Sequence, residues 1–171
     1  SQSRQFLTEE IRRTVKESGA AKDEDVFIRY IVTRGSGPLD LDPATATQTS
    51  YIILVKEIPP WNPVFYKEGM SLAVPQTARN SPRSLDPNIK CGNYLNNILA
   101  VSEAKDLGAD DALLLSLDGK LTEASNSNVI FVNNGELQTP KHEPGTNTGN
   151  LRGLTRTLIS DLASRAGISY S

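Results

Sequence analysis

Three short segments of the sequence carry residues that could act together in one chemical reaction. The first surrounds Lys90, which stands between Ile89 and Cys91 rather than between other charges. Apolar surroundings disfavour the ammonium form of a lysine, so its amine becomes a nucleophile that can form an imine with a carbonyl group. The alternative is an ordinary solvated loop lysine, since lysines are rarely buried in folded proteins.

The second segment, residues 121–129, contains an acid followed by small hydrogen-bonding residues. Glu123 is the acid, and Ser125 and Asn126 belong to the polar run after it. Because apolar stretches flank this segment, it could present a carboxylate and several donors to a planar ligand. The alternative is the exposed end of a hairpin.

The third segment, Gly153-Leu154-Thr155-Arg156, opens a predicted helix. The free amide N–H groups and the dipole at the start of a helix favour an anion such as phosphate, and Thr155 adds a hydroxyl. A plain helix cap is the alternative. Together, an amine nucleophile, a carboxylate and a phosphate-binding site are what pyridoxal 5'-phosphate (PLP) requires from a protein.

Periodic apolar residues predict the elements that must position these groups. In the first part of the chain we expect a helix over residues 7–18 and strands over 26–33 and 51–57. Three prolines within Ile58–Pro63 break the regular structure and mark a domain boundary.

The second part begins with a short strand over 70–74 and a loop over 75–89. A helix follows from about residue 94 to Gly108, then a strand over 112–117, a hairpin over 129–138 with a tight turn at Asn134-Gly135, and a last helix from 154 to 166. A final strand should begin at Ile168. Because the chain begins and ends inside this pattern, we expect a fragment of a larger fold.

Composition excludes several other kinds of protein. The net charge is −2 and no run of basic and aromatic residues suggests a nucleic-acid surface. Cys91 and His142 are the only cysteine and histidine, which argues against a thiolate cluster or a hydrolytic zinc site, so we expect no metal. We see no apolar stretch that could cross a membrane and expect a cytoplasmic protein.

The order of these motifs resembles that of the class IV (fold-type IV) PLP-dependent aminotransferases. The resemblance rests on Lys90-x-x-Asn93-Tyr94-Leu95, Glu103-Ala104, Gly108–Ala112, the segment 121–129 and Gly153–Arg156. It implies an α/β fold of the D-amino acid aminotransferase-like type. Residues 1–57 would be the remainder of a small domain, 58–68 an interdomain loop, and 69–171 the front part of a large PLP-binding domain.

The resemblance also implies roles for the residues that hold the cofactor. Lys90 would be the catalytic residue that forms the Schiff base with PLP and then shuttles a proton. Glu123 would pair with the pyridine nitrogen and Tyr94 would hydrogen-bond the 3'-oxygen of the ring. The remaining expected cofactor-binding residues are Ser125, Asn126 and, through backbone amides that hold the phosphate, Leu154 and Thr155.

On the substrate side, the resemblance implies that Arg29 helps to bind a carboxylate. Phe27 stands where branched-chain enzymes usually have a tyrosine. Leu39 and Leu41 replace the arginine and histidine of the D-amino acid enzymes, which counts against that activity, and Arg152 stands where proline is common.

We therefore expect a homodimeric transaminase that moves an amino group between a branched-chain or similar L-amino acid and 2-oxoglutarate, with no nucleic-acid or membrane partner. One alternative is an aminodeoxychorismate lyase of the same fold, which would use the same Lys90 imine. The other is a non-catalytic fragment or an inactive relative that has kept the fold.

Overall fold

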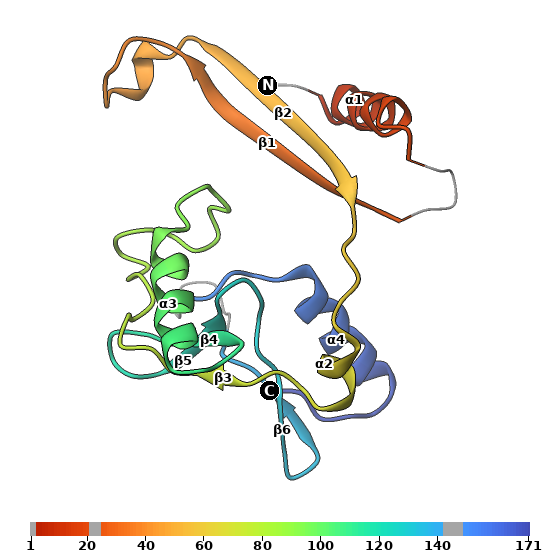
Figure 1. The fold of residues 1–171 in the computed structure, drawn as a ribbon, viewed down its shortest axis with the longest axis vertical. Helices are drawn as coiled ribbons and strands as arrows, with labels where there is room; N and C mark the ends of the chain where they lie inside the picture. Colours follow the sequence, from red (N-terminus) through yellow and green to blue (C-terminus); the bar gives the residue numbers. More distant parts are fainter. Residues whose placement is uncertain (1–2, 21–24, 142–148) are drawn as a thin grey trace. The chain divides into compact units, whose positions relative to one another are not determined.

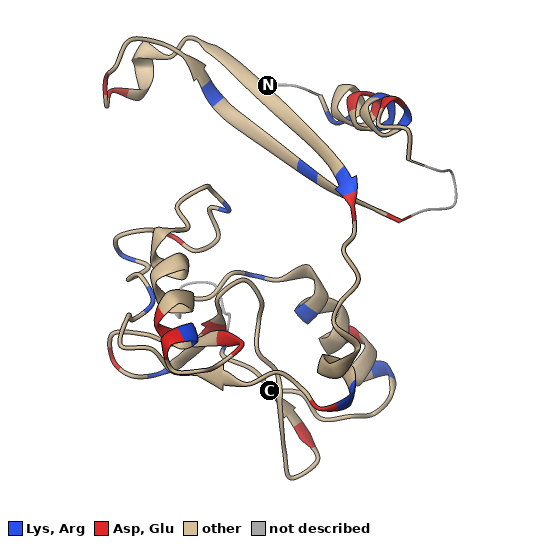
Figure 2. Cartoon of the chain, viewed as in Figure 1, with Lys and Arg blue, Asp and Glu red and all other residues tan. Residues whose placement is uncertain are grey.

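The computed structural model describes residues 3–20, 25–141 and 149–171 and divides the chain into two compact units, Ser1–Asn62 and Pro63–Ser171 (Figure 1). His142 and most of the polar loop expected before Arg152 lie outside the described residues. No helix within the described ranges is long and apolar enough to cross a membrane. Basic and acidic side chains are interspersed on both units (Figure 2).

The first unit consists of a helix and a long hairpin. Helix α1 (Arg4–Glu17) begins at Ser3, whose hydroxyl accepts a hydrogen bond from the Phe6 N–H and so caps the helix. Strands β1 (Val26–Ser36) and β2 (Gln48–Glu57) pair antiparallel, and a short 3-10 helix, η1 (Pro43–Thr45), lies in their connection.

Aromatic and polar contacts attach α1 to β2. The rings of Phe6 and Tyr51 meet edge to face at 5.7 Å between centroids. The Glu10 carboxylate accepts hydrogen bonds from the Arg13 guanidinium and, at 2.7 Å, from the Tyr51 hydroxyl. These two donors, Arg13 first, lower the pKa of Glu10 to about 2, and the bond to Glu10 raises the pKa of Tyr51. The ionised carboxylate therefore joins the helix to the hairpin.

The second unit is built around a small three-stranded sheet. Strand β3 (Leu72–Ala73) pairs parallel with β4 (Asp111–Leu115), which pairs antiparallel with β5 (Leu121–Ala124). The crossover from β3 to β4 contains helix α3 (Leu95–Asp106), which packs on β4. The remaining elements are α2 (Pro63–Lys67), the hairpin of β6 (Phe131–Asn133) and β7 (Glu136–Gln138), and α4 (Leu154–Arg165).

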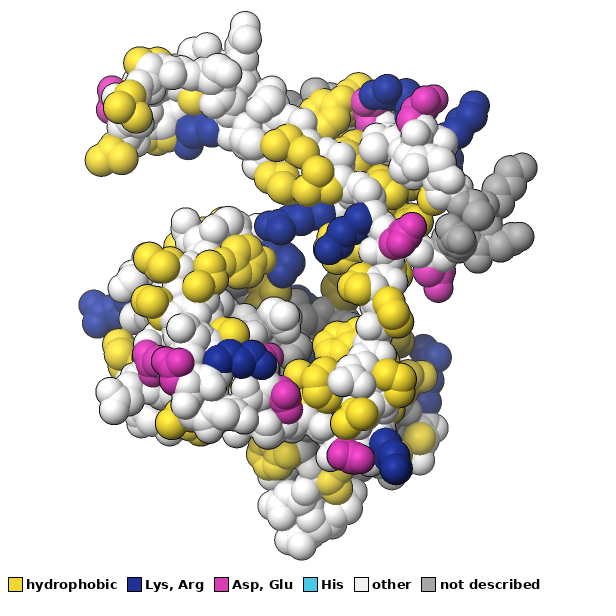
Figure 3. Space-filling view, in the orientation of Figure 1, with side chains coloured by type: hydrophobic (Ala, Val, Ile, Leu, Met, Phe, Trp, Pro, Cys, Tyr) yellow, Lys and Arg dark blue, Asp and Glu magenta, His cyan; other side chains and the backbone are white. Residues whose placement is uncertain are grey.

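The core of this unit lies between α3 and β4. It consists of small side chains from the helix, Ala100 and Ala104, against Ala112 and Leu114 of the strand, all fully buried. Many larger apolar side chains remain at the surface of both units (Figure 3). Alanines at the contact let the helix approach the sheet closely, which also brings the loop before α3 close to β5.

The structure confirms the predicted helices, and each expected strand in the body of the chain has an observed counterpart. It also adds three elements, one of which is η1 in the connection between β1 and β2. Helix α2 lies within residues 58–68, where we expected only loop. Its first residue is Pro63, and proline is well tolerated there because the N–H that it lacks would have no hydrogen-bond partner within the helix. Strand β5 was not predicted as such, and in place of a final strand there is one parallel bridge, Leu137 to Tyr170. The assignment of 1–57, 58–68 and 69–171 to a small domain, a loop and a large domain stays a prediction.

Candidate active site

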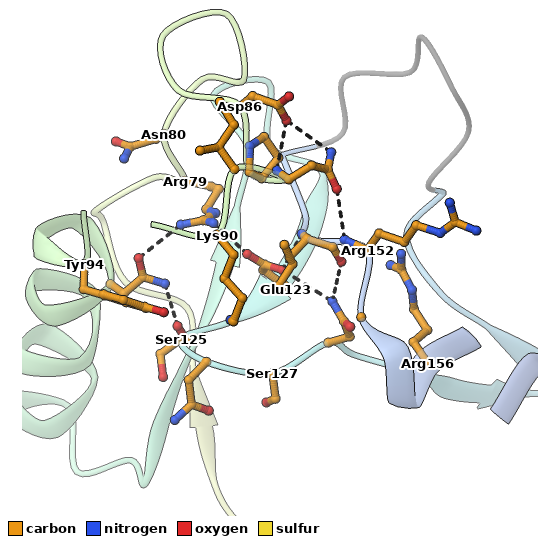
Figure 4. A pocket seen from close by; sticks show the side chains of 18 of the residues that line it. Arg79, Asn80, Asp86, Lys90, Tyr94, Glu123, Ser125, Ser127, Arg152 and Arg156 are labelled. Atoms are coloured by element: carbon orange, nitrogen blue, oxygen red, sulfur yellow. Dashed lines mark hydrogen bonds and ion pairs between the residues drawn. The ribbon is translucent and has the colours of Figure 1, made fainter. Parts of the chain in front are cut away.

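The second unit contains an open cavity of about 710 Å³ between the loop before α3, the end of β5 and the start of α4. All seven residues expected to bind the cofactor line this cavity: Lys90, Tyr94, Glu123, Ser125, Asn126, Leu154 and Thr155 (Figure 4). Their individual roles stay predictions. No group of three possible metal ligands occurs among the described residues.

Glu123 presents a buried carboxylate to the cavity. It lies on β5 opposite Leu114 of β4, and it is only 6% exposed. One carboxylate oxygen, Oε1, lies 2.7 Å from Nη2 of Arg79. The other, Oε2, accepts from the backbone N–H of Leu151 at 2.8 Å and from Nδ2 of Asn128 at 3.4 Å. The alternative interpretation of this segment as an exposed hairpin end is therefore wrong.

Lys90 lies in the loop five residues before α3 and is exposed. Its neighbour Ile89 is 61% exposed. The expectation that apolar side chains keep water away from this amine is therefore wrong for the described residues. The reason is local: Ile89 and Lys90 belong to a series of tight turns, where the N–H of Lys90 donates to the carbonyl of Asn88. Burial by its sequence neighbours therefore does not explain a reactive amine.

The start of α4 forms the third side of the cavity. The residue that precedes the helix, Gly153, is extended and offers no side chain to cap it. The N–H groups of Leu154 and Thr155 belong to the first turn, where no carbonyl of the helix can accept from them. A Cβ atom on Gly153 would lie 1.7 Å from Oδ1 of Asn128, so only glycine fits at this place with Asn128 as it stands.

Sequence reasoning missed three polar residues of the site. Arg79 forms the ion pair with Glu123, and Asn97 of α3 accepts a hydrogen bond from Arg79. Asn128 reaches both Glu123 and the carbonyl of Leu151. Arg79 follows β3 in an irregular loop without a motif, and Asn97 is one of several polar residues of α3, with nothing in the sequence to distinguish it from them. Only Asn128, at the end of the polar run after Glu123, carried a signal that could have been followed.

A carboxylate of α3 anchors the loop that carries Arg79. Glu103 accepts hydrogen bonds from the hydroxyl and the N–H of Thr77 and from the N–H of Gln76. These donors, the Thr77 hydroxyl first, hold the pKa of Glu103 below its usual range. The ionised Glu103 thus fixes the chain two residues before Arg79.

Arg29 lies in the other unit, exposed on β1 and opposite Leu54 of β2. It is not among the residues that line the cavity. Its expected part in substrate binding stays a prediction.

The sequence profile of the family described as amino-transferase class IV matches residues 1–171, the whole chain. The chain belongs to the class IV aminotransferases. It is 33% identical over 144 residues to the putative branched-chain-amino-acid aminotransferase of Methanocaldococcus jannaschii, a match that covers 84% of this chain and 48% of that protein.

Solved structures of aminotransferases share the fold. The branched-chain amino acid aminotransferase of Escherichia coli superposes with a TM-score of 0.89 at 26% identity, over 100% of this chain and 55% of that one. An aminotransferase of Brucella abortus bound to PLP gives 0.76 at 27% identity, over 95% and 56%. This chain therefore spans about half the length of these relatives, and the fold is the α/β fold expected from the sequence.

Proposed function

We propose that this class IV aminotransferase is a PLP-dependent transaminase that moves an amino group between a branched-chain or similar L-amino acid and 2-oxoglutarate. The observation that carries the proposal is that Lys90, Glu123 and the first turn of α4 line one cavity. The family uses PLP, and the Methanocaldococcus jannaschii and Escherichia coli relatives are named as branched-chain enzymes.

The cavity has groups that suit each part of the cofactor. The buried carboxylate of Glu123 suits the pyridine nitrogen, and the first-turn amides at Leu154 and Thr155 suit the phosphate. When bound, PLP would supply an aldehyde and an electron-withdrawing ring, and Lys90 would be the residue that holds it through its amine. The volume of about 710 Å³ falls in the range of small-molecule sites.

The residues of the chain would then divide the work of the reaction. Lys90 would move the proton at the substrate α-carbon. Tyr94 holds the ring at its 3'-oxygen, and Ser125 and Asn126 line the cavity after the carboxylate. Arg29 binds the substrate carboxylate. As part of the same proposal, the protein works in the cytoplasm as a homodimer.

The test is to add an L-amino acid to the protein loaded with PLP. A transaminase should take the amino group and leave pyridoxamine phosphate in the site, which changes the visible absorbance, and 2-oxoglutarate should restore it. L-Leucine should react faster than its D-enantiomer. Release of pyruvate from aminodeoxychorismate, without conversion of the cofactor by L-leucine, would support the lyase instead.

A protein that takes up no PLP, or whose visible absorbance is the same in Lys90→Ala, would overturn the proposal.

A further inference from the structure

The Arg79 guanidinium is held at all three of its nitrogens. Nη2 faces Oε1 of Glu123 at 2.7 Å, Nε donates to the carbonyl of Gly149 at 3.0 Å, and Nη1 donates to Oδ1 of Asn97 at 3.1 Å. The arginine side chain is 14% exposed. Because a guanidinium is planar, three contacts in different directions leave it no freedom to rotate.

The hydrogen bonds of Asn97 connect Arg79 back to the segment that carries Glu123. Asn97, which accepts from Arg79, donates through Nδ2 to the carbonyl of Ser125 at 2.5 Å, two residues after Glu123. Figure 4 shows Arg79 and Glu123 side by side in the cavity, with Ser125 below them. The carboxylate and the strand that bears it are thus fixed by one arginine and one helix.

We propose that Arg79 is a positioning residue for the cofactor ring: it fixes the orientation of the Glu123 carboxylate opposite the pyridine nitrogen. The inference rests on the proposed function. A buried carboxylate is costly unless it is paired, and removal of its partner leaves an uncompensated charge that must move away from its present place. A carboxylate that has turned away no longer faces the ring nitrogen.

The rival interpretation is that Arg79 only stabilises the fold, since it joins the loop after β3 to α3, β5 and Gly149. A residue that only stabilises the fold would affect the binding of every ligand of the cavity equally. A positioning residue for the nitrogen would matter only to a ligand that has this nitrogen. An analogue of PLP in which carbon replaces the ring nitrogen therefore separates the two interpretations.

The experiment measures the affinities of the full chain for PLP and for the carbon analogue by fluorescence titration, in wild type, Arg79→Met, Arg79→Lys and Arg83→Met. Arg83 is the matched control, because it is an exposed arginine of the same loop that does not line the cavity. Circular dichroism and thermal unfolding report whether each variant is folded.

In Arg79→Met we expect the affinity for PLP to fall about tenfold or more, while the affinity for the analogue stays within about threefold of wild type. Arg79→Lys keeps the charge but not the fork of donors, so the ratio of the two affinities should fall about threefold. Arg83→Met should match wild type with both ligands.

An equal loss of affinity for both ligands, or no loss for either, would overturn the role of Arg79. If Arg79→Met does not fold, Arg79→Lys decides the matter, and a ratio equal to that of wild type overturns the proposal. If wild type binds PLP without a visible band that depends on Lys90, the proposed function fails first and this inference with it.

Discussion

Gly153 occupies a position where the loop before α4 passes close to the side chain of Asn128. A methyl group there would meet Oδ1 of Asn128 and push that amide away from Leu151 and Glu123. The chain therefore needs a residue without a side chain at position 153.

We expect Gly153→Ala to lower the free energy of unfolding by about 1 kcal/mol. The loss of two hydrogen bonds of Asn128 exceeds the gain from a stiffer unfolded chain. Urea unfolding measures the difference. Gly92→Ala is the control, since nothing lies within 4 Å of a Cβ at Gly92; it should be neutral or slightly stabilising. Equal stability of the two variants would show that Asn128 moves at no cost.

At the scale of residues, the sequence indicated the candidate nucleophile, carboxylate and phosphate-binding amides. It did not indicate the side chains that hydrogen-bond to them. Lys90, Glu123 and the first turn of α4 stand out by type and context. Arg79 and Asn97 do not, because an ion pair between a loop and a strand depends on which segments the fold brings together. The pairing of β3, β4 and β5 and the packing of α3 on β4 together decide that.

Among the elements, α4 has an N-terminus that suits a direct test of phosphate binding. Leu154 is the first residue of the helix and is 88% exposed, and Gly153 before it has ψ of 135°. That extended conformation is the one required before a proline, and proline is well tolerated at the first position of a helix. A proline at 154 therefore removes one N–H and leaves the helix intact.

We expect Leu154→Pro to weaken binding of PLP about fivefold to tenfold while binding of pyridoxal, which lacks the phosphate, stays the same. Leu154→Ala, which keeps the N–H, should bind both like wild type. Titrations of the three proteins with both ligands measure this. If the proline variant loses both ligands equally, the phosphate does not sit at this helix.

Helix α1 is joined to β2 by an ionised carboxylate, which makes its attachment dependent on pH. The pKa of Glu10 is lowered to about 2 in the folded chain, below the ordinary value of 4.5. A lowered carboxyl pKa stabilises the folded state above the unfolded pKa, and this contribution is lost as the pH falls from about 4.5 through about 2.

In Glu10→Gln we therefore expect faster hydrogen exchange in α1 than in wild type at about pH 6, and a difference that shrinks as the pH falls toward about 2. Mass spectrometry of peptides from residues 4–17 follows this. Glu9→Gln is the matched control on the preceding residue, because Glu9 accepts a hydrogen bond from Gln5 within its own helix. A difference between Glu10→Gln and wild type that does not change with pH would contradict the role of the charge.

The elements with clear apolar periodicity were predictable, and those without it were not. The Asn134-Gly135 turn is a clear case, since both residues have the positive φ, 50° and 81°, that such a tight hairpin requires. Strand β5 has four residues, of which Thr122 and Glu123 are polar yet buried. A buried strand with polar side chains shows no pattern of hydrophobicity that would reveal it. Here both side chains are buried with partners, since Thr122 donates to the carbonyl of Leu114 and Glu123 pairs with Arg79.

At the scale of the whole molecule, all residues that line the cavity belong to one compact unit, Pro63–Ser171. Its amine, carboxylate and helix terminus come from segments 30 or more residues apart in the sequence. The chain spans about half the length of its relatives. We therefore propose that this cavity binds PLP and that Lys90 is the residue that carries it.

The most direct measurement is to add PLP to the protein, reduce with borohydride, digest and locate the pyridoxyl group by mass spectrometry. The account predicts one dominant label on Lys90, absent from Lys90→Ala and strongly reduced by Glu123→Ala. Lys67 and Lys105 belong to the same unit but do not line the cavity, and they should stay unlabelled. Label spread evenly over the lysines, or none on Lys90, would contradict the account.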